Sequence, residues 1–96
     1  MRFEWDNNKN SANKKKHGLS FEEASELFNL PADNILELYD FDHSENEDRI
    51  ISIGPINRGV ILVVNTERNH GDIIRIISAR FATKTECGYY RSHMGE

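Results

Sequence analysis

The chain has 96 residues, of which 38 % are hydrophobic and 29 % charged, and its formal net charge is −4. This length allows one compact domain, residues 1–96, and excludes two, and the composition excludes a disordered chain. The longest apolar run, 60–64, is far shorter than the ~20 residues of a membrane-spanning helix, and no apolar leader opens the chain. We therefore expect a cytoplasmic protein. The lone Cys87 excludes an internal disulfide.

Charge is distributed unevenly along the chain. The segment 33–48 holds seven of the sixteen acidic residues and no Lys or Arg, so nine acids remain against twelve bases and the rest of the chain carries +3. The basic part can meet phosphates. The acidic segment can meet a basic partner or keep an exposed strand edge soluble, and the sequence alone does not choose between these uses. Its acids are Asp33, Glu37, Asp40, Asp42, Glu45, Glu47 and Asp48.

The N-terminal residues predict a short strand followed by a helix. The stretch 2–5 alternates polar and aromatic residues, which predicts a strand with both rings on its buried side. Asp6 is a candidate N-cap and Gly18 a candidate left-handed C-cap, so the polar, Lys-rich stretch 7–17 between them is predicted to be helical. Its apolar face is poor, and Ala12 is its expected core contact.

A second helix and a set of strands follow. Ser20 and Glu23 have capping-box spacing, and apolar residues recur at helical intervals until Pro31. Beyond it, short β-type runs separated by turns at 54–59 and 69–72 predict an antiparallel meander. The predicted strands are 35–41, 49–53, 60–66 and 73–79.

A last helix completes the predicted fold. Thr83 and Glu86 repeat the capping-box spacing, and the helix that they start carries Cys87, Tyr89 and Tyr90. The element order βααββββα predicts an α+β fold, a small antiparallel sheet with two N-terminal helices and one C-terminal helix.

Two arginines stand out in and beside the apolar run 73–79. Strict alternation places Arg75 and Arg80 on opposite faces of the strand. A guanidinium buried alone costs several kcal/mol, so Arg75 needs a carboxylate such as Glu67 or Glu86, or an open groove. Arg80 is the better candidate phosphate ligand, because it lies at a strand end beside a helix N-terminus, which favours anions.

The sequence predicts no metal site and no cofactor. The four histidines, at 17, 43, 70 and 93, are far apart and have no ligand-type neighbour at helical spacing, and no glycine-rich phosphate loop follows a strand.

Metal-free RNA cleavage uses the ribose 2′-hydroxyl as its nucleophile, with cations to stabilise the transition state and groups that move two protons. The candidates for proton transfer stay open: His17, Glu45, Glu47, Tyr89 and Tyr90.

The residues along almost the whole chain resemble the BrnT toxins, and the order and spacing of the matching pieces make this resemblance specific. The pieces are Phe3-Glu4-Trp5-Asp6, Lys9, Asn13, Lys16-His17-Gly18, Ser20-Phe21-Glu22-Glu23-Ala24, Phe28, His43-Ser44, Arg49, Ile53-Gly54, Thr66-Glu67-Arg68, Arg75-Ile76-Ile77-Ser78-Ala79-Arg80, Ala82-Thr83, Glu86 and Tyr90.

The resemblance implies a RelE-like fold and a ribonuclease that arrests translation. It also implies a partner, a BrnA-like antitoxin with a ribbon-helix-helix domain, in a two-to-two heterotetramer. Operator DNA would then be bound only through the antitoxin.

The resemblance also suggests which residues form the site. The expected catalytic residues are Arg49, Arg80, His17 and Tyr90. The expected RNA-binding residues are Lys9, Arg68 and Arg75, which the resemblance includes, and Lys84, which it does not. Glu86 has a structural alternative as the capping-box residue.

The last helix departs from the family pattern, because Thr85, Cys87 and Gly88 flank Glu86 where basic residues are usual. This departure and the acidic segment support an alternative function, a non-catalytic module that holds a ribbon-helix-helix partner on DNA.

Overall fold

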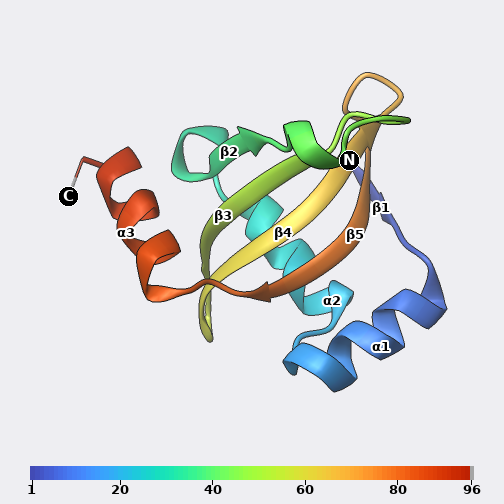
Figure 1. The fold of residues 1–96 in the computed structure, drawn as a ribbon, viewed down its shortest axis with the longest axis horizontal. Coiled ribbons are helices and arrows are strands. Elements are labelled where there is room, and N and C mark those ends of the chain that lie inside the picture. Colours follow the sequence, from blue (N-terminus) through green and yellow to red (C-terminus); the bar gives the residue numbers. More distant parts are fainter. Residues whose placement is uncertain (96) are drawn as a thin grey trace.

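The computed structural model describes residues 1–95 as one five-stranded sheet with helices on both faces (Figure 1). The strand order across the sheet is β1-β5-β4-β3-β2. The main elements are β1 (Arg2–Glu4), α1 (Asn7–His17), α2 (Phe21–Ala24), β2 (Leu36–Tyr39), β3 (Ile50–Ile56), β4 (Gly59–Arg68), β5 (Ile73–Phe81) and α3 (Lys84–His93). Three short 3₁₀ helices are η1 (Ser25–Asn29), η2 (Ala32–Asn34) and η3 (Phe41–His43).

The predicted α+β class and element order are confirmed, with one correction to the sheet. Strands β2 to β5 pair antiparallel, but β1 pairs parallel with β5, so the sheet is mixed. Asp6 caps α1, Ser20 caps α2, and Thr83 with Glu86 forms a complete capping box at α3. Among residues 1–95, each helix is too short or too polar to span a bilayer.

The predicted turn at 54–59 is wrong at its start. Strand β3 continues through Gly54 and Pro55, and the turn consists only of Asn57 and Arg58. Proline is tolerated here because β2 pairs with β3 only as far as Ile53, so the strand beyond that point has a free side.

The expected core contact of α1 is also wrong. Ala12 is exposed, whereas the neighbouring Asn13 is buried with 8 % of its surface accessible. An asparagine can be buried in this way only if its amide forms hydrogen bonds.

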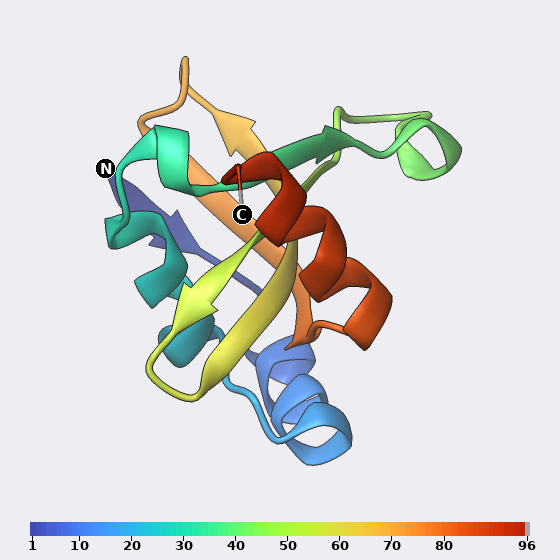
Figure 2. The same cartoon turned by 90° about the vertical axis from the view of Figure 1, so that its left-hand side faces the viewer.

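The sheet has two differently covered faces. The first, called the α1 face, packs Ile61, Val63, Ile74 and Ile76 against Phe21 and other residues of the N-terminal helices. The second, called the α3 face, carries Ile53, Leu62 and Val64, and α3 covers part of it through Tyr90 and Met94 (Figure 2). Several polar residues of the second face therefore remain accessible.

A β-bulge places Arg75 and Arg80 on the same face of the sheet. Val64 pairs with Ser78 and the next residue of β4, Asn65, pairs with Ile76, so Ile77 is an extra residue in β5. Arg80 lies opposite Leu62 and Arg75 lies opposite Thr66, both on the α3 face. The prediction that the two arginines lie on opposite faces is therefore wrong. It assumed strict alternation along the strand, and the extra residue of the bulge interrupts that alternation.

Candidate functional site

A hollow of about 480 Å³ opens on the α3 face, where the sheet meets α1 and α3. Strands β3 and β4 form its apolar floor, α1 contributes basic residues of its last turn, and β5 and α3 contribute a charged pair. Its lining residues are Lys16, His17, Ile51, Leu62, Val64, Ser78, Ala79, Arg80 and Glu86. Two of the four predicted catalytic residues, His17 and Arg80, are thus brought together.

The amide of Asn13 attaches α1 to the edge of β5. Strand β1 pairs with β5 only as far as Arg75, so in the part of the chain that the structure describes the second half of β5 has no strand neighbour on that side. There, Asn13 Nδ2 donates to the carbonyl of Ala79 at 2.7 Å, and Ala79 N donates to Asn13 Oδ1 at 3.1 Å. Nδ2 also donates to the carbonyl of Leu19 at 2.8 Å. These bonds fix the last turn of α1 beside β5, which brings His17 to the rim of the α3 face.

Arg80 is held by the first turn of α3. Its Nη1 and Nη2 donate to the two carboxylate oxygens of Glu86, both at 2.8 Å, and Nη1 also donates to the carbonyl of Phe81 at 3.3 Å. A guanidinium has five N–H donors, so within residues 1–95 these three bonds leave Nε–H and one Nη2–H without a hydrogen bond. The two remaining donors form the side fork of the guanidinium, a geometry that matches two oxygens of a phosphate.

Glu86 serves both the helix cap and Arg80. Its Oε1 accepts from Thr83 N at 2.8 Å, while its backbone N donates to the Thr83 hydroxyl at 3.2 Å. The hydrogen bonds from Arg80, followed by the backbone bond from Thr83, lower the pKa of Glu86 to about 2 despite its partial burial. The structural role anticipated for Glu86 is therefore present, together with a contact to Arg80 that its capping-box spacing did not indicate.

A smaller hollow of about 240 Å³ extends the site along α1. Lys16, His17 and Ser78 line both hollows, and Lys9 lines the second one. Lys16 was missed as a site residue, although it lies seven residues after Lys9 and so shares its helical face.

Three further arginines form a looser cluster with two glutamates on the α3 face. Arg68 pairs with Ile73, which lies on the same face of β5 as Arg75, so both arginines are on the α3 face. Arg49 lies two residues before Ile51, and strand alternation places it on this face too. Glu4 Oε1 lies 3.5 Å from Arg68 Nε and 3.6 Å from Arg75 Nη1. The partner of Arg75 is therefore Glu4, and the predicted pairing with Glu67 or Glu86 is wrong.

The second glutamate, Glu47, joins the cluster from the loop before β3. Its carboxylate lies 3.7 Å from Arg68 Nη2 and 3.9 Å from Arg49 Nε. All four contacts in this cluster exceed ordinary N–H···O hydrogen-bond lengths, unlike those of Arg80. Three guanidiniums share two carboxylates, so the cluster keeps a positive charge and donors that can contact an anion.

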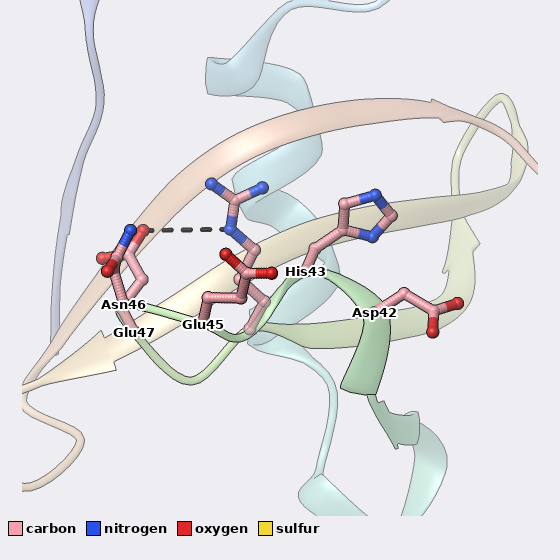
Figure 3. Close-up of a pocket in the computed structure, with 6 residues that line it drawn as sticks. Asp42, His43, Glu45, Asn46 and Glu47 are labelled. Carbon is pink, nitrogen blue, oxygen red and sulfur yellow. Dashed lines mark ion pairs between the residues drawn. The ribbon is translucent and has the colours of Figure 1, made fainter.

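Arg49 does not reach the hollow that contains Arg80. It lines a separate hollow of about 380 Å³, formed with Asp42, His43, Glu45, Asn46 and Glu47. Figure 3 shows the ion pair of Glu47 in that hollow, and the carboxylate of Asp42 pointing away from this ion pair. The expected juxtaposition of Arg49 with Arg80 is thus not found, although the two lie on the same face of the sheet.

The remaining predicted site residues lie outside the main hollow. The hydroxyl of Tyr90 donates to the carbonyl of Asn34 at 2.7 Å, and the side chain is 9 % exposed, so it attaches α3 to η2. Lys84 is the exposed first residue of α3. Within residues 1–95, no three His, Cys, Asp or Glu side chains converge in a way that would hold a metal ion.

Comparison with known proteins identifies the family. A family model described as "Ribonuclease toxin, BrnT, of type II toxin-antitoxin system" matches residues 5–86. Comparison with curated proteins finds no match. The matched range includes Lys9, His17, Arg80 and Glu86 and ends before Tyr90, in the helix where the sequence departs from the expected pattern. The chain belongs to the BrnT ribonuclease toxins of type II toxin–antitoxin systems, a class that acts with an antitoxin partner.

Proposed function

We propose that this protein is a metal-independent endoribonuclease that cleaves RNA within the hollow shared by His17 and Arg80, and thereby inhibits translation. The observation that carries the proposal is the convergence of a histidine, a lysine and an arginine with a free donor fork on one accessible hollow. Such a set can bind a phosphodiester and move a proton.

In the proposed reaction, the ribose 2′-oxygen attacks the adjacent phosphorus and the bond from phosphorus to the 5′-oxygen breaks. His17 moves one of the two protons, taking that of the 2′-hydroxyl or delivering one to the departing 5′-oxygen, and solvent water carries the other. The products are a 2′,3′-cyclic phosphate and a 5′-hydroxyl. Arg80 stabilises the charge on the non-bridging oxygens through its side fork. Glu86 acts as a positioning residue because it fixes the guanidinium through the other fork.

The basic residues around the hollow are proposed to bind the RNA backbone. Lys9 and Lys16 extend the site along α1, and Lys84 lies at the start of α3. Arg49, Arg68 and Arg75 would contact phosphates farther along the α3 face. For Tyr90 we propose support of α3 in place of the expected catalytic role, because its hydroxyl is bound to Asn34.

Cleavage by the purified chain tests this function. A short RNA should yield a 2′,3′-cyclic phosphate end in the presence of EDTA, whereas the same oligonucleotide with 2′-deoxy sugars should remain intact. Cleavage should weaken as salt rises, because the backbone contacts are ionic. Intact RNA in these assays would contradict the proposal, and a product that disappears with EDTA would assign the reaction to a metal.

One observation favours the alternative function, a non-catalytic module in a DNA-binding repressor complex. The charge of Arg80 is paired with Glu86, which weakens its attraction for a second anion. The alternative predicts repression in complex with the partner and no RNA cleavage by the free chain, so the RNA-cleavage assay separates the two.

For the partner, we propose a BrnA-like antitoxin with a ribbon-helix-helix domain, assembled as two toxins with two antitoxins in the cytoplasm. Operator DNA would be bound through the antitoxin. Light scattering on the co-purified complex tests this stoichiometry.

A further inference from the structure

The free edge of the sheet carries an exposed aromatic and acidic patch. We define the β2 patch as Glu37, Leu38, Tyr39, Phe41, Asp42 and Glu45. Strand β2 is the last in the sheet order, and within residues 1–95 its only strand partner is β3. Leu38, 44 % exposed, and Tyr39, 43 % exposed, lie on opposite faces of β2, and Phe41, 82 % exposed, packs against Tyr39. Large apolar side chains thus face solvent on both sides of an unpaired strand edge, which is typical of an interaction surface.

Local hydrogen bonds hold the patch in place. The rings of Tyr39 and Phe41 meet edge to face with centroids 4.6 Å apart, and the hydroxyl of Tyr39 donates to Asp48 at 2.7 Å. The loop that follows is closed by Ser44, whose hydroxyl accepts from Arg49 N at 3.0 Å. Phe41 is therefore presented to solvent by a defined structure.

The charge of the patch selects the class of partner. It lies in the segment 33–48, which has seven acids and no Lys or Arg. Among residues 1–95, Asp42 and Glu45 form no ion pair, so both carboxylates are available to a cation from outside. Nucleic acid and a second copy of the same edge would both bring negative charge to this surface, which is unfavourable.

We propose that the β2 patch binds a basic, extended segment of the antitoxin as a sixth strand of the sheet. Main-chain hydrogen bonds to the free edge of β2 would supply affinity, and an apolar side chain of the segment would pack on Leu38 or Phe41. Lysine or arginine side chains on the segment would pair with Asp42 and Glu45. The proposal rests on the partnership with an antitoxin, but not on RNA cleavage.

The exposed ring of Phe41 lies outside the hollow that contains His17 and Arg80, whereas Asp42 and Glu45 line the hollow of Arg49. Strand β5, which carries Arg80, lies two strands away from β3 and three from β2 in the sheet order. Phe41→Asp should consequently lose the partner and retain RNA cleavage. This separation allows the failure of this proposal to be distinguished from the failure of the proposed function.

The first experiment uses a synthetic probe and nuclear magnetic resonance of the labelled protein. The probe is a capped peptide of about ten residues that alternates lysine with valine, and the control peptide alternates glutamate with valine. We expect the lysine peptide to shift the signals of residues 36–45 and the glutamate peptide to shift none. Absence of binding at about millimolar peptide, or shifts concentrated around Arg80, would overturn the proposal.

The second experiment uses variants of the patch. Phe41→Asp and the double variant Asp42→Lys with Glu45→Lys should each weaken binding of the lysine peptide by about tenfold or more. Tyr89→Asp is the matched control, because Tyr89 is a 59 % exposed aromatic residue on α3. Equal weakening in the control, or unchanged binding in both patch variants, would overturn the proposal.

Two further measurements cover the other occupants of the surface. RNA cleavage by Phe41→Asp should equal that of the wild-type chain, and reduced cleavage would indicate an RNA surface instead. Sedimentation should show that the wild-type chain does not self-associate through this surface. Self-association that Phe41→Asp abolishes would overturn the proposal, because it would identify a second copy as the occupant. If the wild-type chain cleaves no RNA, the proposed function fails while the peptide results still decide this inference.

Discussion

Asn13 and Ala79 form a pair of hydrogen bonds like that between residues of two neighbouring strands, although Asn13 belongs to a helix. The side-chain amide of Asn13 accepts from Ala79 N and donates to Ala79 O, at 3.1 and 2.7 Å. One side chain thus satisfies both backbone groups of Ala79, at the edge of β5 that β1 leaves unpaired. The same contact sets the position of His17 relative to Arg80, so it connects the stability of the fold with the geometry of the site.

Replacing Asn13 should therefore lower both stability and activity. Asn13→Ala leaves three buried backbone groups without their bonds, which should cost about 3 kcal/mol of unfolding free energy, measured by urea denaturation. Asn8→Ala, at an exposed position of the same helix, should change it by less than about 0.5 kcal/mol. Similar losses in the two variants would show that the Asn13 amide does not anchor α1 to β5.

Arg80 should be required for cleavage through its two free donors. Arg80→Ala should lower kcat about 10²- to 10³-fold, and Arg80→Lys should recover little because an ammonium group cannot form two parallel bonds. Arg58→Ala is the control, since Arg58 also binds a carboxylate, Glu23, with two bonds but lies outside the hollow. Full activity of Arg80→Ala in a folded protein would refute the assignment.

The pair of Glu86 with Arg80 should make stability depend on pH in acid. The pKa of Glu86 falls from 4.5 to about 2 on folding, so its contribution is complete above about pH 4.5 and is lost as the pH falls toward 2. With allowance for the partial exposure of both side chains, this contribution is about 2 kcal/mol. Glu86→Gln should be less stable than the wild-type protein at pH 7, and the difference should shrink toward pH 2. A difference that is constant with pH would show that the pair does not act in this way.

His17 should affect the chemical step and leave stability nearly unchanged. His17→Ala should lower kcat by about 10²-fold or more, because a proton-transfer group is lost. His93→Ala, at the exposed end of α3, is the matched control and should retain full kcat. A change confined to KM would instead assign His17 to RNA binding.

Two glycines should respond in opposite directions to alanine. A Cβ at Gly54 would lie 2.6 Å from the side chain of Leu27, which is fully buried, so Gly54→Ala should destabilise the protein by about 1 to 3 kcal/mol. At Gly88, within α3, a Cβ would meet nothing within 4 Å, and Gly88→Ala should stabilise by about 0.5 to 1 kcal/mol. Thermal unfolding measures both, and equal signs for the two changes would contradict the close packing of Leu27 on Gly54.

The family and the element order could be read from the sequence because they depend on local signals. Capping residues such as Asp6 and Thr83, and apolar periodicity within each segment, act over a few residues. The position of Gly54 inside a strand could not be predicted from local signals, because a glycine followed by a proline usually indicates a turn. Here the glycine is required because the side chain of Leu27, a residue distant in sequence, packs against it.

The arrangement of the site was decided only by the tertiary structure. The sequence by itself determined that the chain has basic residues on a helix and in a strand, and that an acidic segment lies between them. The bulge at Ile77 then moved Arg75 to the face of Arg80, and the amide of Asn13 brought His17 to that face. Both effects depend on the pairing of segments far apart in sequence, and alternation within a single strand contains no information about such pairing.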